Sequence, residues 1–194
     1  MEWTIAVICG ASGAGKSTVA RPLAWRRELP LVEADDLVTA LTAMTSQATH
    51  PWLHRWQTDP ACRDWSPDEI VAHSIAVADQ LAPAFRAVLA DHLEYRAPVV
   101  IEGDYLLPDL AVGLVGVRAV VISEPDEQQI VENLRRREPG AGEQRARATV
   151  SVRYDAHLTE RARHCGVPVV PARPFDTLLA RVDQALVGDT RPDS

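Results

Sequence analysis

One stretch of the chain, residues 10–18, carries residue types suited to holding phosphate groups. Its letters are GASGAGKST, and they fit the pattern G-x-x-x-x-G-K-[ST]. The glycines let the backbone curl so that amide groups point at phosphate oxygens, and the following helix adds its positive dipole end. Lys16 would bridge the β- and γ-phosphates, and Ser17 would ligate magnesium. The pattern predicts a site for ATP and Mg²⁺ formed by Gly10, Ala11, Ser12, Gly13, Ala14, Gly15, Lys16, Ser17 and Thr18.

Lys16 is the only lysine in the chain, while every other basic position that is not histidine is arginine. The planar fork of arginine suits bidentate pairing, whereas a phosphate loop needs a compact ammonium group on a flexible stem. A bias in the composition of the chain explains why lysine is absent elsewhere, and the need to bind phosphate explains why it is kept at position 16. We therefore expect Lys16 to be catalytic.

A kinase reaction would also need a carboxylate that accepts or orients the proton of the acceptor hydroxyl. Asp35 and Asp36 follow the short apolar run at residues 31–33, and either could serve. The alternative is that one of them caps a helix that starts near residue 36. A second acidic pair, Glu102 and Asp104, follows another apolar run, and its alternative role is a strand-end turn.

Short apolar runs alternate with helical patterns along the chain, which predicts an α/β fold with a five-stranded parallel sheet and helices on both faces. The predicted strands are residues 4–9, 31–33, 99–102, 119–122 and 167–170. The predicted helices cover about 15–27, 36–44, 66–95 and 126–137, and the letters SPDE from Ser66 signal the start of the long one. Residues 46–66 are expected to be irregular.

The composition restricts the kind of protein this can be. The chain has 194 residues, a net charge of −7 and three cysteines far apart in sequence, and its pI is about 5.3. We expect one domain over residues 1–187 with a tail at 188–194, and no affinity for nucleic acid, because phosphate backbones need a positive surface. We also expect no membrane association, a cytoplasmic location, and a monomer or homodimer.

The phosphate loop and the letters LVEADDLVTAL resemble the nucleotide-kinase-like P-loop small-molecule kinases, the group of shikimate kinase, gluconate kinase and chloramphenicol phosphotransferase. The resemblance implies a three-layer P-loop NTPase fold in which Asp35 is the catalytic carboxylate and Asp36 lies beside the substrate. It also implies that Glu102 lies near magnesium, directly or through water, and that Asp104 meets the substrate.

Further implications of this resemblance concern the loops around the nucleotide. Residues 135–153 look like the mobile lid of such kinases, with Arg135 and Arg136 as catalytic residues, although basic side chains at a helix end also suit its dipole. Ala172 and Arg173 are candidate contacts to the adenine base, or else a simple turn. The block at residues 46–97 would form the substrate-binding region over the strand ends.

The aromatic residues of that block, Trp52, Trp56 and Trp65, could line a pocket for a ring-bearing substrate, but aromatic core packing is the favoured interpretation. Taken together, the pattern predicts an ATP-dependent phosphotransferase whose acceptor is a hydroxyl of a metabolite or an antibiotic-like natural product. The alternatives are a nucleoside monophosphate kinase and an ATP-binding regulator that is not a kinase. A GTPase is disfavoured because no N-K-x-D motif is present.

Overall fold

The sheet is built from five parallel strands, in a computed structural model that describes residues 3–188. The strands are β1 (Ile5–Cys9), β2 (Leu31–Glu33), β3 (Val99–Gly103), β4 (Val117–Ser123) and β5 (Val169–Pro171). Their order is β2-β3-β1-β4-β5, so β1 is central and has β3 and β4 as neighbours. The predicted five-stranded parallel sheet is confirmed. Because the strands are parallel, the loops that follow them meet along one edge, where such sheets bind ligands.

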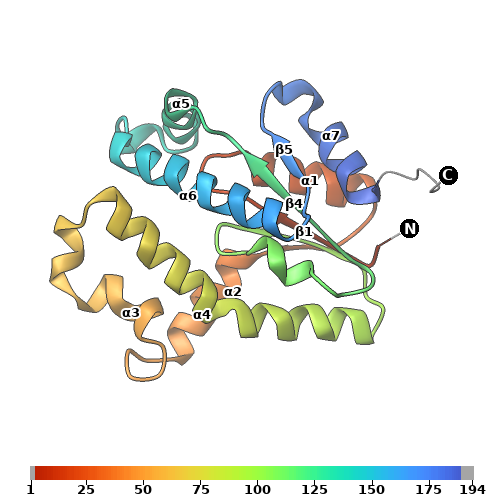
Figure 1. The fold of residues 1–194 in the computed structure, drawn as a ribbon, viewed down its shortest axis with the longest axis horizontal. Helices are drawn as coiled ribbons and strands as arrows, with labels where there is room; N and C mark the ends of the chain where they lie inside the picture. The colour runs from red at the N-terminus through yellow and green to blue at the C-terminus, as the bar shows by residue number, and fades with distance from the viewer. Residues whose placement is uncertain (1–2, 189–194) are drawn as a thin grey trace.

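Helices cover both faces of the sheet, which confirms the three-layer prediction (Figure 1). On one face lie α4 (Pro67–Glu94) and α6 (Arg145–His164), and on the other lie α1 (Lys16–Arg26) and α7 (Phe175–Val187). Side chains of a strand alternate between faces. Accordingly, Ile5 and Val7 of β1 join the core below α4 and α6, while Ala6 and Ile8 join the core below α1 and α7.

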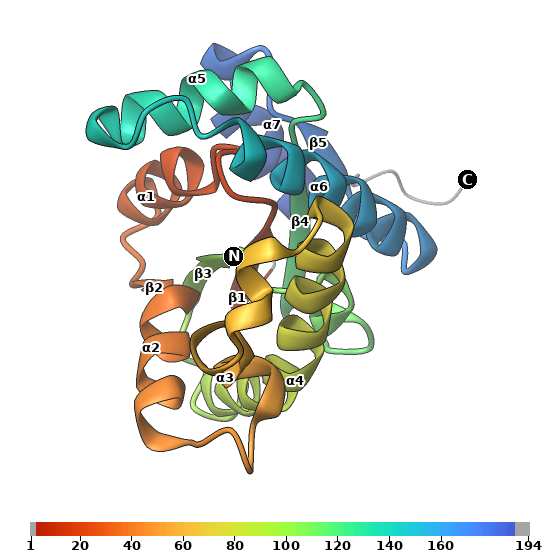
Figure 2. The same ribbon diagram turned by 90° about the vertical axis from the view of Figure 1, so that its left-hand side faces the viewer.

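The remaining helices lie around the carboxyl ends of the strands. Figure 2 shows α5 (Glu127–Arg137) and the start of α6 on one side of these ends, and α2 (Ala34–Met44), α3 (Pro51–Thr58) and α4 on the other. A small apolar cluster of Ile130, Val131, Leu134 and Ala148 joins α5 to α6. The two groups of helices therefore face each other across the phosphate loop.

The predicted start of the long helix is confirmed in detail. The Ser66 hydroxyl accepts a hydrogen bond from the Glu69 amide at 3.3 Å, and the Glu69 carboxylate accepts one from the Ser66 amide at 2.8 Å. These paired bonds satisfy two amides at the helix start. The helix then continues through Pro83 to Glu94.

Two sequence expectations about local structure are wrong. Residues 46–66 are not simply irregular, because they contain α3 and a 3-10 helix at Pro60–Asp64, each with proline at its start. Proline suits the first helical turn, where its missing amide has no partner to lose. The second wrong expectation is the list of helices, which leaves out residues 145–164, where α6 runs.

The expectation that the tryptophans of residues 46–66 pack into the core is also wrong. Trp52 and Trp56 are 39% and 51% exposed, and the Trp56, Trp65 and His73 rings contact one another at the surface of the insertion.

No helix within residues 3–188 is both long and apolar enough to cross a bilayer. Residues 189–194 of the predicted tail lie outside the described residues.

Candidate active site

The phosphate loop connects the central strand β1 to α1, and its backbone conformation explains its glycines. Gly10 has a φ of +155°, and a Cβ atom there would lie 2.7 Å from the Ile122 carbonyl oxygen. Gly15, which precedes the first turn of α1, has a φ of +100°. Side chains rarely tolerate this region of φ, so the loop can turn sharply only with glycine there.

Lys16 lies at the centre of the site and is 6% exposed. Its Nζ atom donates a hydrogen bond to the carbonyl oxygen of Ala11 at 3.0 Å and forms an ion pair with Asp104. Asp104 follows β3, which is the direct neighbour of β1. The sheet order therefore brings the acid to the lysine although 88 positions separate them.

Ser17 and Glu102 form a second polar pair beside Lys16. The Ser17 hydroxyl donates to the Glu102 carboxylate at 2.6 Å, and Glu102 is only 4% exposed. Burial raises the pKa of Glu102, and the hydrogen bond from Ser17 opposes that shift. A hydroxyl and a carboxylate side by side are the oxygen donors that Mg²⁺ prefers, so these two residues fit the predicted magnesium site.

Close packing brings the start of α2 to the end of β3. A Cβ atom on Gly103 would lie 2.4 Å from Cβ of Ala34, so only glycine permits this approach. Asp35 follows directly, and partial burial together with the charge of Asp104 raises its pKa. The capping alternative is not what the structure shows, because Glu33 is the residue before the helix and no side chain caps it. Asp36 is also in the first turn, and the side chains of both aspartates are exposed.

A cavity of about 380 Å³ opens above the phosphate loop. Its walls include Gly13, Gly15, Lys16, Ser17 and Thr18 of the loop, with Asn133 and Arg136 of α5 opposite. The Asn133 side-chain amide donates to the Gly13 carbonyl at 2.9 Å, which ties α5 to the loop. Arg136 thus lines this cavity, whereas Arg135 lies outside these walls, and both side chains are exposed. A catalytic role for either arginine stays a prediction.

Two other arginines reach the loop more directly. Arg137 and Arg147 lie with Nη2 atoms 3.4 Å and 3.2 Å from the Ser12 hydroxyl, and Glu138 pairs with both. Hydrogen bonds from these two guanidinium groups lower the pKa of Glu138. The sequence selected Arg135 and Arg136 from the same basic cluster, because a run of adjacent arginines does not show which of them faces the loop.

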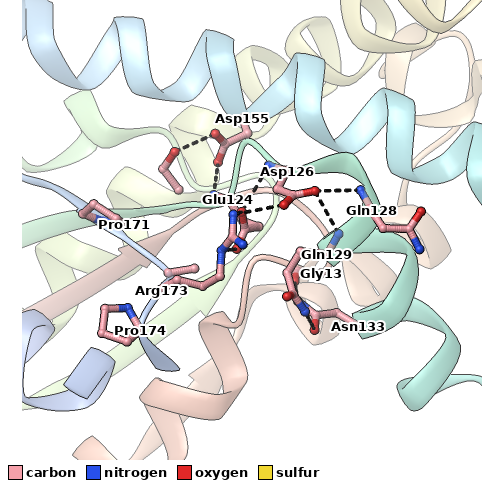
Figure 3. Close-up of polar contacts among 12 residues, drawn as sticks. Gly13, Glu124, Asp126, Gln128, Gln129, Asn133, Asp155, Pro171, Arg173 and Pro174 are labelled. Carbon is pink, nitrogen blue, oxygen red and sulfur yellow. Dashed lines mark hydrogen bonds and ion pairs between the residues drawn. The ribbon is translucent and has the colours of Figure 1, made fainter. Parts of the chain in front are cut away.

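Arg173, the predicted base contact, takes part in an ion-pair cluster on the other side of the phosphate loop (Figure 3). Its guanidinium lies 3.0 Å from the buried Glu124 carboxylate and 3.2 Å from that of Asp126. Asp155 of α6 accepts from the Ser123 hydroxyl at 2.7 Å and from the Glu124 amide at 3.2 Å. A contact between Arg173 and the adenine base stays a prediction. Phe175, which the sequence analysis did not single out, lines the 380 Å³ cavity.

Comparison with known proteins agrees with this geometry. A family model described as an AAA domain matches residues 5–160, from β1 through most of α6. The chain belongs to this AAA-domain family. No curated protein sequence matches the chain significantly.

Solved structures share the fold of this AAA-domain chain at low sequence identity. Shikimate kinase from Acinetobacter baumannii, in complex with shikimate, is 16% identical with a TM-score of 0.54, over 98% of this chain and 96% of that one. TT1252 from Thermus thermophilus is 18% identical with a TM-score of 0.53, over 99% and 100%. An uncharacterized protein from Eubacterium ventriosum is 14% identical with a TM-score of 0.56, over 97% and 99%. These structures thereby confirm the fold that the resemblance to P-loop small-molecule kinases implied.

The AAA-domain chain brings most of its predicted site residues to one place. Lys16, Ser17, Glu102 and Asp104 contact one another in pairs, and Asp35 lies close enough for the charge of Asp104 to act on it. The arrangement offers a phosphate cradle, oxygen ligands for a cation, and a carboxylate beside them. Such a set can bind a nucleoside triphosphate and hold an attacking hydroxyl near its terminal phosphate.

Proposed function

We propose that this protein is an ATP-dependent phosphotransferase that transfers the γ-phosphoryl group to a hydroxyl group of a small molecule. The observation that carries the proposal is the convergence of Asp104 and Asp35 on the lysine of the phosphate loop. A protein that only binds ATP needs no such carboxylate, and one that hydrolyses ATP needs it only to orient a water molecule. A phosphotransferase needs one to receive or orient the hydroxyl proton of its acceptor.

The donor side of the proposed reaction is held by the phosphate loop. Its amides and Lys16 would bind the β- and γ-phosphates, and Arg137 and Arg147 would neutralise charge on the transferred group. In the structure these two guanidinium groups already meet at Ser12 of the loop. Ser17 and Glu102 would hold Mg²⁺, which neutralises phosphate charge when it is bound.

Asp35 would act on the acceptor. The hydroxyl oxygen forms a bond to the γ-phosphorus while the bond from phosphorus to the β–γ bridging oxygen breaks, and ADP leaves with that electron pair. The hydroxyl proton passes to the Asp35 carboxylate and then to solvent. A pKa raised by partial burial makes Asp35 a better proton acceptor than an ordinary aspartate.

Mass spectrometry tests the proposal directly. The protein is incubated with magnesium ATP and pooled hydroxyl compounds that include metabolites, nucleoside monophosphates and antibiotic-like natural products. We expect one acceptor to gain one phosphate while ADP forms in equal amount, and Lys16→Ala to abolish both. A nucleoside monophosphate as the acceptor would favour the nucleotide kinase alternative, and ADP without any phosphorylated acceptor would favour the regulator.

A further inference from the structure

A second pocket, of about 330 Å³, lies between α2, α3 and α4 on the side of the site opposite α5. Its volume is at the lower end of the range of about 300–1,000 Å³ for small-molecule sites. The apolar part of its lining consists of Val38, Leu53, Trp56, Ile70, Val77 and Tyr105. We call it the insertion pocket, because most of these residues belong to the block at 46–97.

The lining of the insertion pocket includes no lysine, arginine, aspartate or glutamate. Its polar members are three neutral side chains and His73. Burial lowers the pKa of His73, and the hydrogen bond that its Nε2 atom donates to the Trp52 carbonyl at 2.9 Å only partly opposes this shift, so the pocket favours the neutral ring. An anionic ligand would lose hydration there without gaining a charged partner, which is costly.

The neighbouring arginines point elsewhere. Arg55 of α3 lies over the rings of Trp52 and Trp65 and pairs with Asp59, on a separate open groove. Arg147 is engaged with Glu138 and Ser12 on the donor side. Neither arginine belongs to the lining of the insertion pocket, and the charge of Arg55 reaches that lining only at His73, where it favours the neutral ring.

The insertion pocket is continuous with the reacting groups. Tyr105 and Ser74 line both this pocket and a smaller cavity of about 170 Å³, which is also lined by Ser12, Asp104 and Arg147. The cation nearest the acceptor path is therefore Arg147, on the phosphate side of this smaller cavity and outside the insertion pocket. Asp35, Val38 and Thr42 are three and four residues apart on α2 and therefore share one helix face. Asp35 thus lies at the end of the pocket wall that is nearer the phosphate loop, and its charge acts on Tyr105.

We propose that the acceptor is an uncharged, largely apolar alcohol or phenol whose body fills the insertion pocket and whose hydroxyl points to Asp35. This rests on the proposed function and narrows its acceptor class. Hydroxy acids and phosphorylated acceptors are excluded from the pocket by its lack of cationic side chains. Size restricts the acceptor further, to about one or two rings.

The test uses matched acceptors that differ in charge alone. Each neutral hydroxyl compound in a panel, such as 4-methylbenzyl alcohol, is paired with a carboxylate of similar shape, such as 4-(hydroxymethyl)benzoate. Initial rates of phosphorylated product are measured with saturating magnesium ATP. We expect the neutral members to be preferred by more than about tenfold in kcat/KM.

If the acceptor binds in the insertion pocket, a positive charge added to the lining should change the preference for neutral acceptors. Thr42→Arg places a guanidinium in the lining, and we expect it to lower the preference for neutral members by about tenfold or more. The matched control is Gln47→Arg, which adds the same charge on the separate groove beside Arg55 and should leave the preference unchanged. Stabilisation of each variant by magnesium ATP in thermal unfolding shows that it is folded and binds nucleotide.

The outcomes separate the two proposals. If acceptors are phosphorylated but the carboxylates are preferred, or if Thr42→Arg leaves the preference unchanged, the inference about the pocket is overturned and the phosphotransferase stands. If nothing in the panel or in the earlier pools gains phosphate while ATP still binds, the proposed function fails and the acceptor class fails with it.

Discussion

The two sides of the candidate site are built in different ways. The donor side is formed by backbone amides, by glycines with positive φ and by buried charged side chains. Among these side chains, Lys16 and Glu102 are 6% and 4% exposed. On the acceptor side, neutral and apolar side chains of three helices form the wall, and Trp56 is 51% exposed. The donor side is fixed by backbone geometry, whereas the acceptor side is formed by side chains that can be exchanged without changing the fold.

This contrast matches the chemistry that each side would perform. A triphosphate is the same in every reaction of this kind, so one loop geometry serves all of them. Acceptors differ in shape and charge, so their pocket is lined by side chains of α2, α3 and α4 and not by the phosphate loop. Substitutions on the two sides should therefore fail in different ways, and the following experiments separate them.

The largest effect is expected from Lys16→Arg. The buried ammonium bonds to Ala11 and Asp104, and a planar guanidinium is too large for that place. We expect kcat/KM to fall by about 10³-fold, which is typical of losing a group that stabilises developing charge.

The control for Lys16→Arg is Arg26→Lys, the reverse exchange at an exposed position in the last turn of α1. It should retain normal kcat/KM. A fully active Lys16→Arg protein would show that the loop lysine is not needed for phosphoryl transfer.

Asp35→Asn tests the junction between the two sides. Loss of the carboxylate removes the proton acceptor, so kcat should fall by about 10²-fold. Nucleotide binding should be unchanged, because Asp35 lies outside the walls of the nucleotide cavity. Steady-state kinetics with isothermal titration of the ATP analogue AMP-PNP measures both, and the same exchange at Asp36 serves as the comparison. Near-normal turnover in Asp35→Asn with unchanged nucleotide binding would make the assignment wrong.

Arg147→Ala tests the arginine pair at Ser12. One of two guanidinium groups would remain, so we expect kcat to fall by about tenfold rather than to vanish. Arg163→Ala, at the exposed far end of the same helix, is the matched control. Equal rates for the two variants would show that Arg147 does not act on the phosphates of the donor.

Trp56→Ala should affect the acceptor side alone. Loss of one ring from the insertion pocket should raise the KM for the acceptor about tenfold and leave the KM for ATP unchanged. Trp25→Ala, on a ring that is 85% exposed on α1, is the control. A raised KM for ATP in Trp56→Ala would mean that the two sides are not separable.

The smallest effect concerns stability. The pKa of Asp35 is raised above its ordinary value of 3.8, so the folded protein binds a proton at higher pH than the unfolded chain does. Asp35 therefore adds to the free energy of unfolding as the pH falls from above the pKa of the folded protein to below that of the unfolded chain. At neutral pH the ionised carboxylate destabilises the fold. We expect Asp35→Asn to melt slightly higher than the wild type at pH 7, with a smaller difference at pH 4. Thermal unfolding at both pH values checks this, and a lower melting temperature at pH 7 would contradict it.

The donor side could be predicted from sequence because its chemistry is local. The residues from Gly10 to Thr18 are contiguous, and strand β1 and helix α1 on either side follow simple apolar patterns. The pairing of Lys16 with Asp104 is not local, since it depends on β3 being placed next to β1. The sequence did not predict this pairing, because the family resemblance assigned Asp104 to the substrate and not to Lys16.

The acceptor side and α6 were harder to predict for physical reasons. The buried face of α6 includes Ala148, Ser151, Asp155, Thr159 and Ala162, which are small or polar, so the hydrophobic period that marks a helix is weak. In α3 only Leu53 and His54 are buried, because the helix has eight residues and lies on the outside of the insertion. Aromatic residues suggest a core in a sequence, but here Trp56 lines the insertion pocket and Trp52 lines the separate groove.

The single lysine also gives the chain a built-in chemical label. Lys16 carries the only side-chain amine in the sequence, so an amine-directed reagent can modify only this residue and the amino terminus. Its position under the phosphate loop means that a bound triphosphate would cover it. The rate of acylation at Lys16, compared with that of the nucleotide-free protein, should therefore fall as nucleotide fills the site, and it can be followed with no mutation or added fluorophore.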